Sequence, residues 1–345
     1  MVGVSFRRYK VAVVKISYIK LDIDDLDSAR DKIRETFLQQ NGIITEIRDR
    51  VDIHSAKPRK TRRVFAVDSG FNRAYETLFT LMKAAVVDEE MNVEYNEDIY
   101  LFHVDNYQTD RLKRLLMQRA LYEALAETVE IGRADGSLIL VDGTITLSVF
   151  YPTLKDRKEY RRHFGEFYEK LYSPLLKQCV NKDIVILGFL KRTGSAYLAE
   201  HAGVKGTYDS YISNTLLRRD GQFIGPIPVI DSSAKRSKVH HKYVTFYLNL
   251  KNWNYRFELL KEQECIYLEC IENLLHMATE AHYGMNPVFS KADEYARVTN
   301  REANLKFDYL THDLRANERA ILRLGARKRT HFGYGARRLM RRLPG

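Results

Sequence analysis

Two aspartates at the ends of short apolar runs are the residues of this sequence best placed to do chemistry. Asp68 closes the run VFAV and Asp142 closes the run LILV, and turn residues follow both. In an open α/β sheet, ligands bind beyond the strand ends, where convergent carboxylates suit Mg²⁺ or Mn²⁺. For either aspartate alone, an Asx-turn that simply ends a strand is the favoured interpretation. Two of them in one basic chain shift the balance toward a metal site.

A third acidic group is available on the helix expected just before the second of these strands. Glu123, Glu127 and Glu130 all lie on it, and the first two are four residues apart and share a face. Glu123 has the more apolar neighbours, which favours an inward direction for its side chain. Most helical glutamates are solvated, so the residues alone leave this choice open.

Other catalytic motifs are absent from the sequence. The stretch 188–195 is loosely like a phosphate loop, but its lysine precedes the second glycine and the G-x-x-x-x-G-K-[ST] spacing is not met. There is no G-x-S-x-G elbow, no H-E-x-x-H and no G-x-G-x-x-G. Lys191 and Arg192 directly follow an apolar strand and are candidate phosphate contacts. An ordinary charged loop is an equally good interpretation of the same two residues.

Positive charge is concentrated in two places. The chain has 56 Lys and Arg against 45 Asp and Glu, a formal charge of +11. Residues 301–345 hold twelve of the cations against four acids and so contribute +8 of that charge. A second cluster precedes the strand that ends at Asp68, and it consists of Lys57, Arg59, Lys60, Arg62 and Arg63. Such concentrations attract polyanions, so nucleic acid is the first partner to consider, ahead of a solvated tail or an acidic protein.

The composition is that of a folded globular protein without disulfides or membrane spans. Of 345 residues, 45% are hydrophobic and 29% are charged, with seven prolines. No run reaches the ~18 apolar residues of a membrane helix, and the N-terminus lacks the pattern of a signal peptide. Three cysteines are too few for a disulfide framework, and Cys265 and Cys270 do not have a zinc spacing. We therefore expect a soluble intracellular protein.

Hydrophobic periodicity predicts a mixed series of strands and helices. Strands are expected at about 10–23, 63–70, 76–87, 99–104, 137–143, 183–190, 216–229 and 243–250. Helices are expected at about 28–52, 109–131 and 155–180, and from 264 onward with a break at 284–287. The alternation in YVTFYLNL, residues 243–250, predicts a half-buried strand. The series indicates one α/β domain with helical additions at both ends; a division near residue 232 rests only on the polar stretch 231–238.

The order and spacing of five segments resemble the NurA family, archaeal and bacterial nucleases that process DNA ends and have an RNase H-like core. The likeness covers about residues 60–310. Its segments are VFAVDSG at 64–70, LYEAL at 121–125, ILVDGT at 139–144, LKRT at 190–193, and GMNPVF at 284–289 ahead of KAD at 291–293. The resemblance implies an RNase H-like mixed sheet with flanking helices in a nuclease domain at 61–310. An N-terminal strand and helix extension at 1–60 and a basic C-terminal tail at 311–345 would flank it.

By this resemblance, Asp68, Glu123 and Asp142 occupy the acidic positions that bind two Mn²⁺ ions in the family. A histidine is usual in the C-terminal helix, in a pattern like A-H-x-x-A, and this sequence has Asp293 at that place, in ADEYA. We expect Asp293 to be the fourth ligand. A carboxylate is a harder ligand and adds negative charge, so the site is expected to hold Mn²⁺, or Mg²⁺ in its place, or to have altered activity.

The resemblance also implies DNA contacts outside the carboxylates. The cations expected to bind backbone phosphates are Lys191, Arg192, Arg59, Lys60, Arg62 and Arg63. Such contacts recognise charge and shape, so little sequence preference is expected. The family carries a functional tyrosine in its middle region, which aligns equally well with Tyr208 and Tyr211.

The activity that the resemblance implies is that of a metal-dependent deoxyribonuclease, a 5′–3′ exonuclease and single-strand endonuclease that resects DNA ends in double-strand break repair. Hydrolysis would follow two-metal logic, with one ion activating water and the other stabilising the leaving oxygen. Expected partners are single- and double-stranded DNA, a HerA-type hexameric translocase and a second copy in a homodimer, in the cytoplasm at the nucleoid. Two alternatives stay open: a non-catalytic DNA-binding or translocase-regulating subunit of the same fold, and an RNA-directed nuclease.

Overall fold

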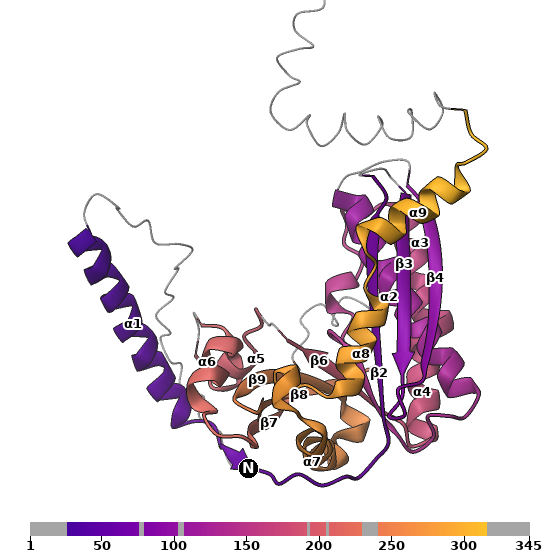
Figure 1. Ribbon diagram of the computed structural model, residues 1–345. Coiled ribbons are helices and arrows are strands. Elements are labelled where there is room, and N and C mark those ends of the chain that lie inside the picture. The colour runs from indigo at the N-terminus through magenta and orange to yellow at the C-terminus, as the bar shows by residue number, and fades with distance from the viewer. Residues whose placement is uncertain are drawn as a thin grey trace, which may run out of the picture. The chain divides into compact units, whose positions relative to one another are not determined.

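The structure of the chain, a computed structural model, groups into two compact units that are both discontinuous in sequence (Figure 1). It describes residues 26–75, 79–102, 107–191, 194–204, 207–229 and 241–315. Unit 1 comprises Met1–Thr61, Phe189–Asp231 and His240–Gly284, and unit 2 comprises Arg62–Gly188, Ser232–Val239 and Met285–Gly345. The domain boundaries predicted at 60/61 and 310/311 stay predictions, because residues 1–25 and 316–345 lie outside the described part of the chain.

Unit 2 is built on a mixed sheet. Its strands are β2 (Val64–Arg73), β3 (Phe79–Val87), β4 (Val93–Leu101), β5 (Leu138–Asp142) and β6 (Val185–Leu190), the last belonging to unit 2 up to Gly188. Their order in the sheet is β6-β5-β2-β3-β4. β3 pairs antiparallel with both β2 and β4, whereas β5 pairs parallel with β2. The predicted α/β fold, an RNase H-like mixed sheet with flanking helices, is confirmed.

Helices flank this sheet in unit 2. They are α2 (Tyr107–Glu130), α3 (Lys158–Phe167), α4 (Ser173–Asn181), α8 (Pro287–Ala296) and α9 (Asn300–Leu310), with a 3₁₀ turn at Ser148–Phe150. A π-helical turn, Tyr168–Tyr172, joins α3 to α4, so the helix predicted over 155–180 is confirmed as a nearly continuous helical stretch. α9 begins with a capping box between Thr299 and Glu302. It packs against β3 through a cluster that contains Leu81, Ala303 and Phe307.

Unit 1 combines an antiparallel set of strands with shorter helices. Its strands are β1 (His54–Ser55), β7 (Gln222–Pro228), β8 (Tyr243–Leu250) and β9 (Trp253–Leu260), paired in this order. Its helices are α1 (Leu26–Arg48), α5 (Tyr197–His201), α6 (Asp209–Leu216) and α7 (Tyr267–Met277), with 3₁₀ turns at Lys261–Ile266 and Glu280–His282. The predicted helix at 28–52 and the predicted break at 284–287 are confirmed.

Polar residues inside unit 1 explain where the sequence-based prediction of its strands was wrong. All eight residues of β8 are buried, although the alternation predicted a half-buried strand. The Thr245 hydroxyl donates to the Phe257 carbonyl at 2.7 Å, and the Asn249 amide donates to the Leu217 carbonyl at 3.0 Å. Polar side chains that are satisfied in this way can lie in a core.

Three other segments differ from the prediction. β9 was missed, because its central Arg256 and Glu258 give it a charged pattern; they form a buried ion pair at 2.5 Å. The stretch predicted as a strand from 216 begins as the last residue of α6, and the strand starts at Gln222. β4 begins at Val93, ahead of the predicted 99. The strand predicted at 10–23 lies outside the described residues.

Across the part of the chain that the structure describes, no helix has both the length and the apolar character needed to cross a membrane.

Cysteine labelling tests which of the three thiols are buried and which is exposed. Burial raises the pKa of the Cys179 thiol to about 12, Cys270 is also buried, and Cys265 is exposed. We expect iodoacetamide at pH 8 to modify Cys265 first and Cys179 more slowly by over ~100-fold, since the thiolate is the nucleophile. Mass spectrometry of the labelled peptides, with Cys265→Ser as control, measures this. Comparable labelling of Cys179 in the folded protein would contradict the structure.

An acidic-range stability test follows from the contacts between α9 and β4. The Glu97 carboxylate accepts from Lys306 at 2.8 Å and lies 3.5 Å from the Lys83 ammonium. Burial acts to raise the pKa of Glu97, but the hydrogen bond and charge of Lys306 and the charge of Lys83 lower it below 4.5. The stability that Glu97 contributes is therefore fully present above pH 4.5 and is lost as the pH falls through its folded-state pKa.

We expect Glu97→Gln to lower the unfolding free energy by about 0.5–1 kcal/mol at pH 7, a value that allows for solvent screening, and by less at lower pH. Urea titrations at pH 7 and pH 3.5 measure the difference. Glu94→Gln is the matched control, because Glu94 pairs with Arg133 at a more exposed place on the same strand. If Glu97→Gln lowered the unfolding free energy equally at both pH values, Glu97 would not have a lowered pKa in the folded protein.

Candidate metal centre

Asp68 lies within β2, which runs through it without interruption. Its Cα partner on β3 is Ala85, and the β2–β3 register is regular from Ala66 to Arg73. The side chain is 7% exposed, and the backbone N–H of Ser69 donates to Asp68 Oδ1 at 2.6 Å. The sequence predicted that the strand ends just after Asp68, but it continues to Arg73. Asp68 is therefore held in regular strand backbone, with β3 pairing continuing before and after it.

Asp142 is the last residue of β5 and is brought beside Asp68 by strand pairing. β5 runs parallel to β2, with Val141 opposite Val67, so the next residue of each strand is an aspartate. Gly143 follows with φ of +96°, a conformation that turns the chain sharply out of the strand. A Cβ at Gly188 on β6 would meet the Gly143 carbonyl at 2.9 Å. The close packing of this turn on β6 holds the end of β5 in place.

Asp293 comes from α8, far away in sequence. The Asn286 side chain caps this helix by accepting from the Val288 N–H at 2.8 Å, and Pro287 occupies the first turn. Ala292 and Ala296 are buried. Asp293 is half-buried and lies 3.6 Å from the Arg297 guanidinium.

Gly70 allows α8 to approach β2 closely. A Cβ on Gly70 would lie 2.6 Å from the carbonyl oxygen of Ala296. Asp68 and Gly70 are two residues apart on a regular strand and so face the same side of the sheet, the side that α8 covers. Asn72, two residues further, donates to the Val298 carbonyl just after α8 at 3.1 Å. The sequence suggested Gly70 as a turn residue, whereas its role is close packing.

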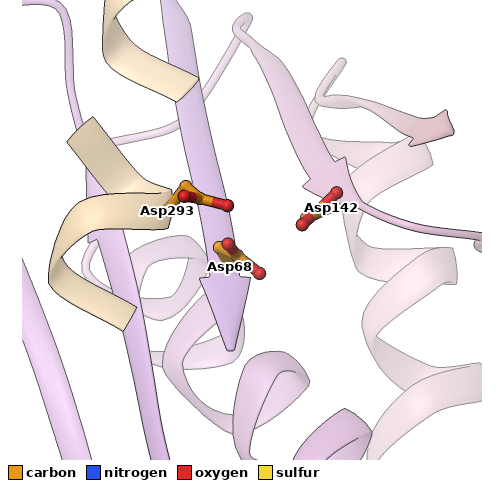
Figure 2. Close-up of side chains that lie close together, drawn as sticks. All are labelled: Asp68, Asp142 and Asp293. Carbon is orange, nitrogen blue, oxygen red and sulfur yellow. The ribbon is translucent and has the colours of Figure 1, made fainter. Parts of the chain in front are cut away.

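The three aspartates converge on one point of unit 2 (Figure 2). One carboxylate oxygen from each of Asp68, Asp142 and Asp293 lies within 4.8 Å of the others. This all-oxygen donor set fits a hard divalent cation such as Mn²⁺ or Mg²⁺. Like charges at such separations repel, and a bound cation relieves that repulsion. Two of the three positions, Asp68 and Asp142, follow from the strand pattern, and Asp293 was expected from the resemblance.

The structure does not bring Glu123 into this group. Its carboxylate accepts from the Arg119 guanidinium on the same helix at 2.7 Å. Glu127, on the same face of α2, accepts from Asn96 of β4 at 3.3 Å. The pKa of Tyr100 on β4 is raised to about 12, first by burial and then by the nearby charges of Asp98 and Glu123. Glu123 thus points toward β4, on the opposite side of β2 from Asp142, and its role as a ligand stays a prediction.

The cations expected to bind DNA have different surroundings. In unit 1, Arg59 pairs with Glu272 at 2.6 Å, Lys60 is exposed and Lys191 is half-buried. In unit 2, the Arg62 side chain is 11% exposed and bonds to Asp183 at 3.0 Å, and Arg63 is exposed. Arg192 lies outside the described residues.

The two tyrosines left open by the resemblance also differ. Tyr208 is 62% exposed, and Tyr211 packs against a hydrophobic cluster of unit 1.

Comparison with known proteins gives one family and several solved structures. Residues 10–298 match the NurA domain family. The NurA nuclease from Sulfolobus solfataricus is similar over 84% of this chain and 98% of its own, at 17% identity and a TM-score of 0.61. A NurA bound to dAMP and manganese is similar over 86% and 99%, at 13% identity and a TM-score of 0.57. At these identities the structural likeness shows the fold. No curated protein sequence matches the chain significantly.

Gly70→Ala tests how the centre is assembled. The new Cβ must displace the backbone of α8, which shifts Asp293 relative to Asp68. We expect a loss of about 1–3 kcal/mol in unfolding free energy, as for overpacked cores, together with weaker Mn²⁺ binding. Urea unfolding and calorimetric Mn²⁺ titration measure both quantities.

Gly165→Ala is the matched control, because no atom lies within 4 Å of a Cβ built at that helical position in α3. Removing a mid-helix glycine there should stabilise the protein by up to ~1 kcal/mol and leave Mn²⁺ binding unchanged. If both variants bound Mn²⁺ as the unmodified protein does, Asp293 would not depend on this packing.

Proposed function

Because the chain belongs to the NurA family, we propose that it is a metal-dependent deoxyribonuclease that hydrolyses phosphodiester bonds at DNA ends. The observation that carries the proposal is the convergence of Asp68, Asp142 and Asp293. The finer activity that we propose is 5′–3′ exonuclease and single-strand endonuclease action in double-strand break repair. The similar structures, a NurA nuclease and a NurA bound to dAMP and manganese, support a metal-dependent nuclease.

The three carboxylates define what the site does. Without a cation, three convergent carboxylates repel a phosphodiester; with Mn²⁺ or Mg²⁺ held between them, that repulsion becomes attraction. When bound, divalent ions, two in our proposal, supply charge stabilisation of the phosphate and lower the pKa of water. Asp68, held by the Ser69 N–H, and Asp142, held by the turn over Gly188, form a rigid pair. Asp293 completes the set from α8.

Further residues of the site are proposed with different support. Lys191, Arg192, Arg59, Lys60, Arg62 and Arg63 are proposed phosphate contacts. Exposure supports Lys60 and Arg63, whereas the ion pairs of Arg59 with Glu272, of Arg62 with Asp183 and of Arg63 with Glu90 compete with phosphate. We further propose a HerA-type hexameric translocase and a second copy of the chain as partners, at the nucleoid in the cytoplasm.

One observation favours a second candidate function. Glu123 points toward β4, and Asp293 stands where the family usually has a histidine, so three carboxylates converge where four ligands were expected. A non-catalytic DNA-binding or translocase-regulating subunit would keep the fold with such a reduced site.

Cleavage assays separate these functions. End-labelled single- and double-stranded DNA and matched RNA are incubated with Mn²⁺, Mg²⁺ or EDTA. We expect metal-dependent cleavage of DNA that Asp142→Asn and Asp293→Ala each lower by at least ~100-fold, since both hold the ions that stabilise the transition-state charge. Cleavage of DNA and RNA alike would indicate a nuclease of broader substrate range.

Glu123→Gln, with Glu127→Gln as matched control on the same face of α2, tests whether Glu123 is a ligand beside the three aspartates. A ligand role predicts a loss like that of Asp142→Asn, and the orientation in the structure predicts rates like those of the control. DNA binding without cleavage under any metal would reject an enzyme that acts alone and leave the non-catalytic subunit or a nuclease that requires its translocase.

A further inference from the structure

A turn in unit 2, Thr153–Asp156, presents an apolar side chain to solvent beside a group of cations. Leu154 is 96% exposed, the most exposed of the large hydrophobic side chains in the described residues. α3 starts directly after the turn. The exposed cations of the turn and of the first helical residues are Lys155, Arg157, Lys158, Arg161 and Arg162. We call these five cations and Leu154 the α3 surface.

The turn is rigidly held. The Thr153 N–H donates to Asp156 Oδ2 at 2.6 Å, and the Thr153 hydroxyl donates to the same oxygen at 2.9 Å. Asp156 is 5% exposed and pairs with the half-buried side chain of Arg111 at 3.1 Å. From α3, Arg161 donates to the Leu154 carbonyl at 3.1 Å. The exposure of Leu154 is therefore built into an ordered turn, and a preorganised apolar side chain costs little entropy when it binds.

The charges of the α3 surface have few internal partners. Glu159 is the one exposed acid between residues 153 and 162. Among the described residues, none forms an ion pair with the side chains of Arg157, Lys158 or Arg162. Exposed like charges at this density repel one another, and a polyanion relieves that repulsion.

The α3 surface lies at the end of the sheet toward which β2 and β5 run. Arg73, the last residue of β2, pairs with Asp110 of α2 at 3.1 Å, and the next residue of α2, Arg111, anchors Asp156 at 3.1 Å. β5 is parallel to β2 and ends at Asp142. Arg73 lies five residues beyond Asp68, or about 17 Å along an extended strand.

We propose that the α3 surface binds single-stranded DNA, with Arg157, Lys158 and Arg162 on phosphates and Leu154 against an unpaired base. Phosphates explain the cations, and an unpaired base explains the apolar tip, since a duplex hides its base faces by stacking. The proposal rests on the proposed function, because it gives the nuclease a contact for a strand that leads to the carboxylates. It adds a DNA contact to those implied by the family resemblance.

Fluorescence anisotropy of a labelled single-stranded oligonucleotide tests the cations. The titrations are run in EDTA at several salt concentrations, so that no cleavage occurs. The triple variant Arg157→Gln, Lys158→Gln and Arg162→Gln removes the three unpaired cations and leaves Arg161, which holds the turn. We expect binding to weaken about 10- to 100-fold near 0.1 M salt, and the slope of log K against log salt to fall by about 2.

A second triple variant of equal charge is the matched control. Arg114→Gln, Lys170→Gln and Lys177→Gln removes three exposed cations elsewhere in unit 2. It should bind the oligonucleotide like the unmodified chain. Equal losses in both variants would show that only total charge matters and would overturn the proposal, as would an unchanged first variant.

A spectroscopic probe tests Leu154 directly. Leu154→Trp is made in a Trp253→Phe background, because Trp253 is the one tryptophan of the chain. We expect single-stranded DNA to quench and shift the emission at 154 by stacking, and duplex DNA to do so much less. Val180→Trp in the same background is the control, at a partly exposed position of α4. Equal quenching at both positions, or none at 154, would contradict the base contact.

These measurements separate the inference from the proposed function. If the unmodified chain binds no DNA at low salt and cleaves none with any metal, the proposed function fails, and the inference with it. If it binds and cleaves DNA while the α3 variants behave like their controls, the inference alone fails.

Discussion

Repulsion among three carboxylates is the constraint on which the architecture of unit 2 depends. Asp68, Asp142 and Asp293 offer oxygens within 4.8 Å of one another, so each must be held against the field of the other two. The structure achieves this with backbone rather than with flexible side chains. Parallel pairing of β2 and β5 sets two of them in register, Gly70 lets the backbone of α8 approach β2, and the Asn286 cap fixes where α8 begins. A divalent cation bound by the three carboxylates offsets the repulsion among them.

The same constraint explains how much of the site the sequence could predict. Asp68 and Asp142 follow nearly continuous apolar strand runs, and such a run with a following turn is a local signal, so both were found from the residues. Asp293 lies on a helix, where one turn offers several directions, and only the resemblance singled it out. Glu123 was given an inward direction from its apolar neighbours; it is half-buried, its carboxylate accepts from Arg119, and its role as a ligand stays a prediction. Gly70 was taken for a turn, since the packing of α8 on it is a long-range contact.

The fold was predictable to a similar degree. The mixed sheet and the long helices of unit 2 follow from periodicity, because its strands are nearly continuous apolar runs. Unit 1 was harder. β8 carries Thr245 and Asn249 into the core, where they donate to carbonyls of Phe257 and Leu217. β9 carries Arg256 and Glu258, which pair with each other inside the core. A pattern that treats polar residues as exposed cannot anticipate partners that exist only after folding.

Unit 2 is interrupted in sequence, and this has a consequence for the order of synthesis. Its β-strands and the helices α2 to α4 leave the ribosome first, then the whole stretch Phe189–Gly284, nearly all of it unit 1, and only afterwards α8 with Asp293. A nascent chain thus carries the strand pair of Asp68 and Asp142 for some time without its third carboxylate. Because domains generally fold as units, unit 2 is completed only after α8 and α9 have been made, when the backbone of α8 packs against Gly70. The three carboxylates of the candidate metal centre are therefore brought together late, once most of the polypeptide has been made.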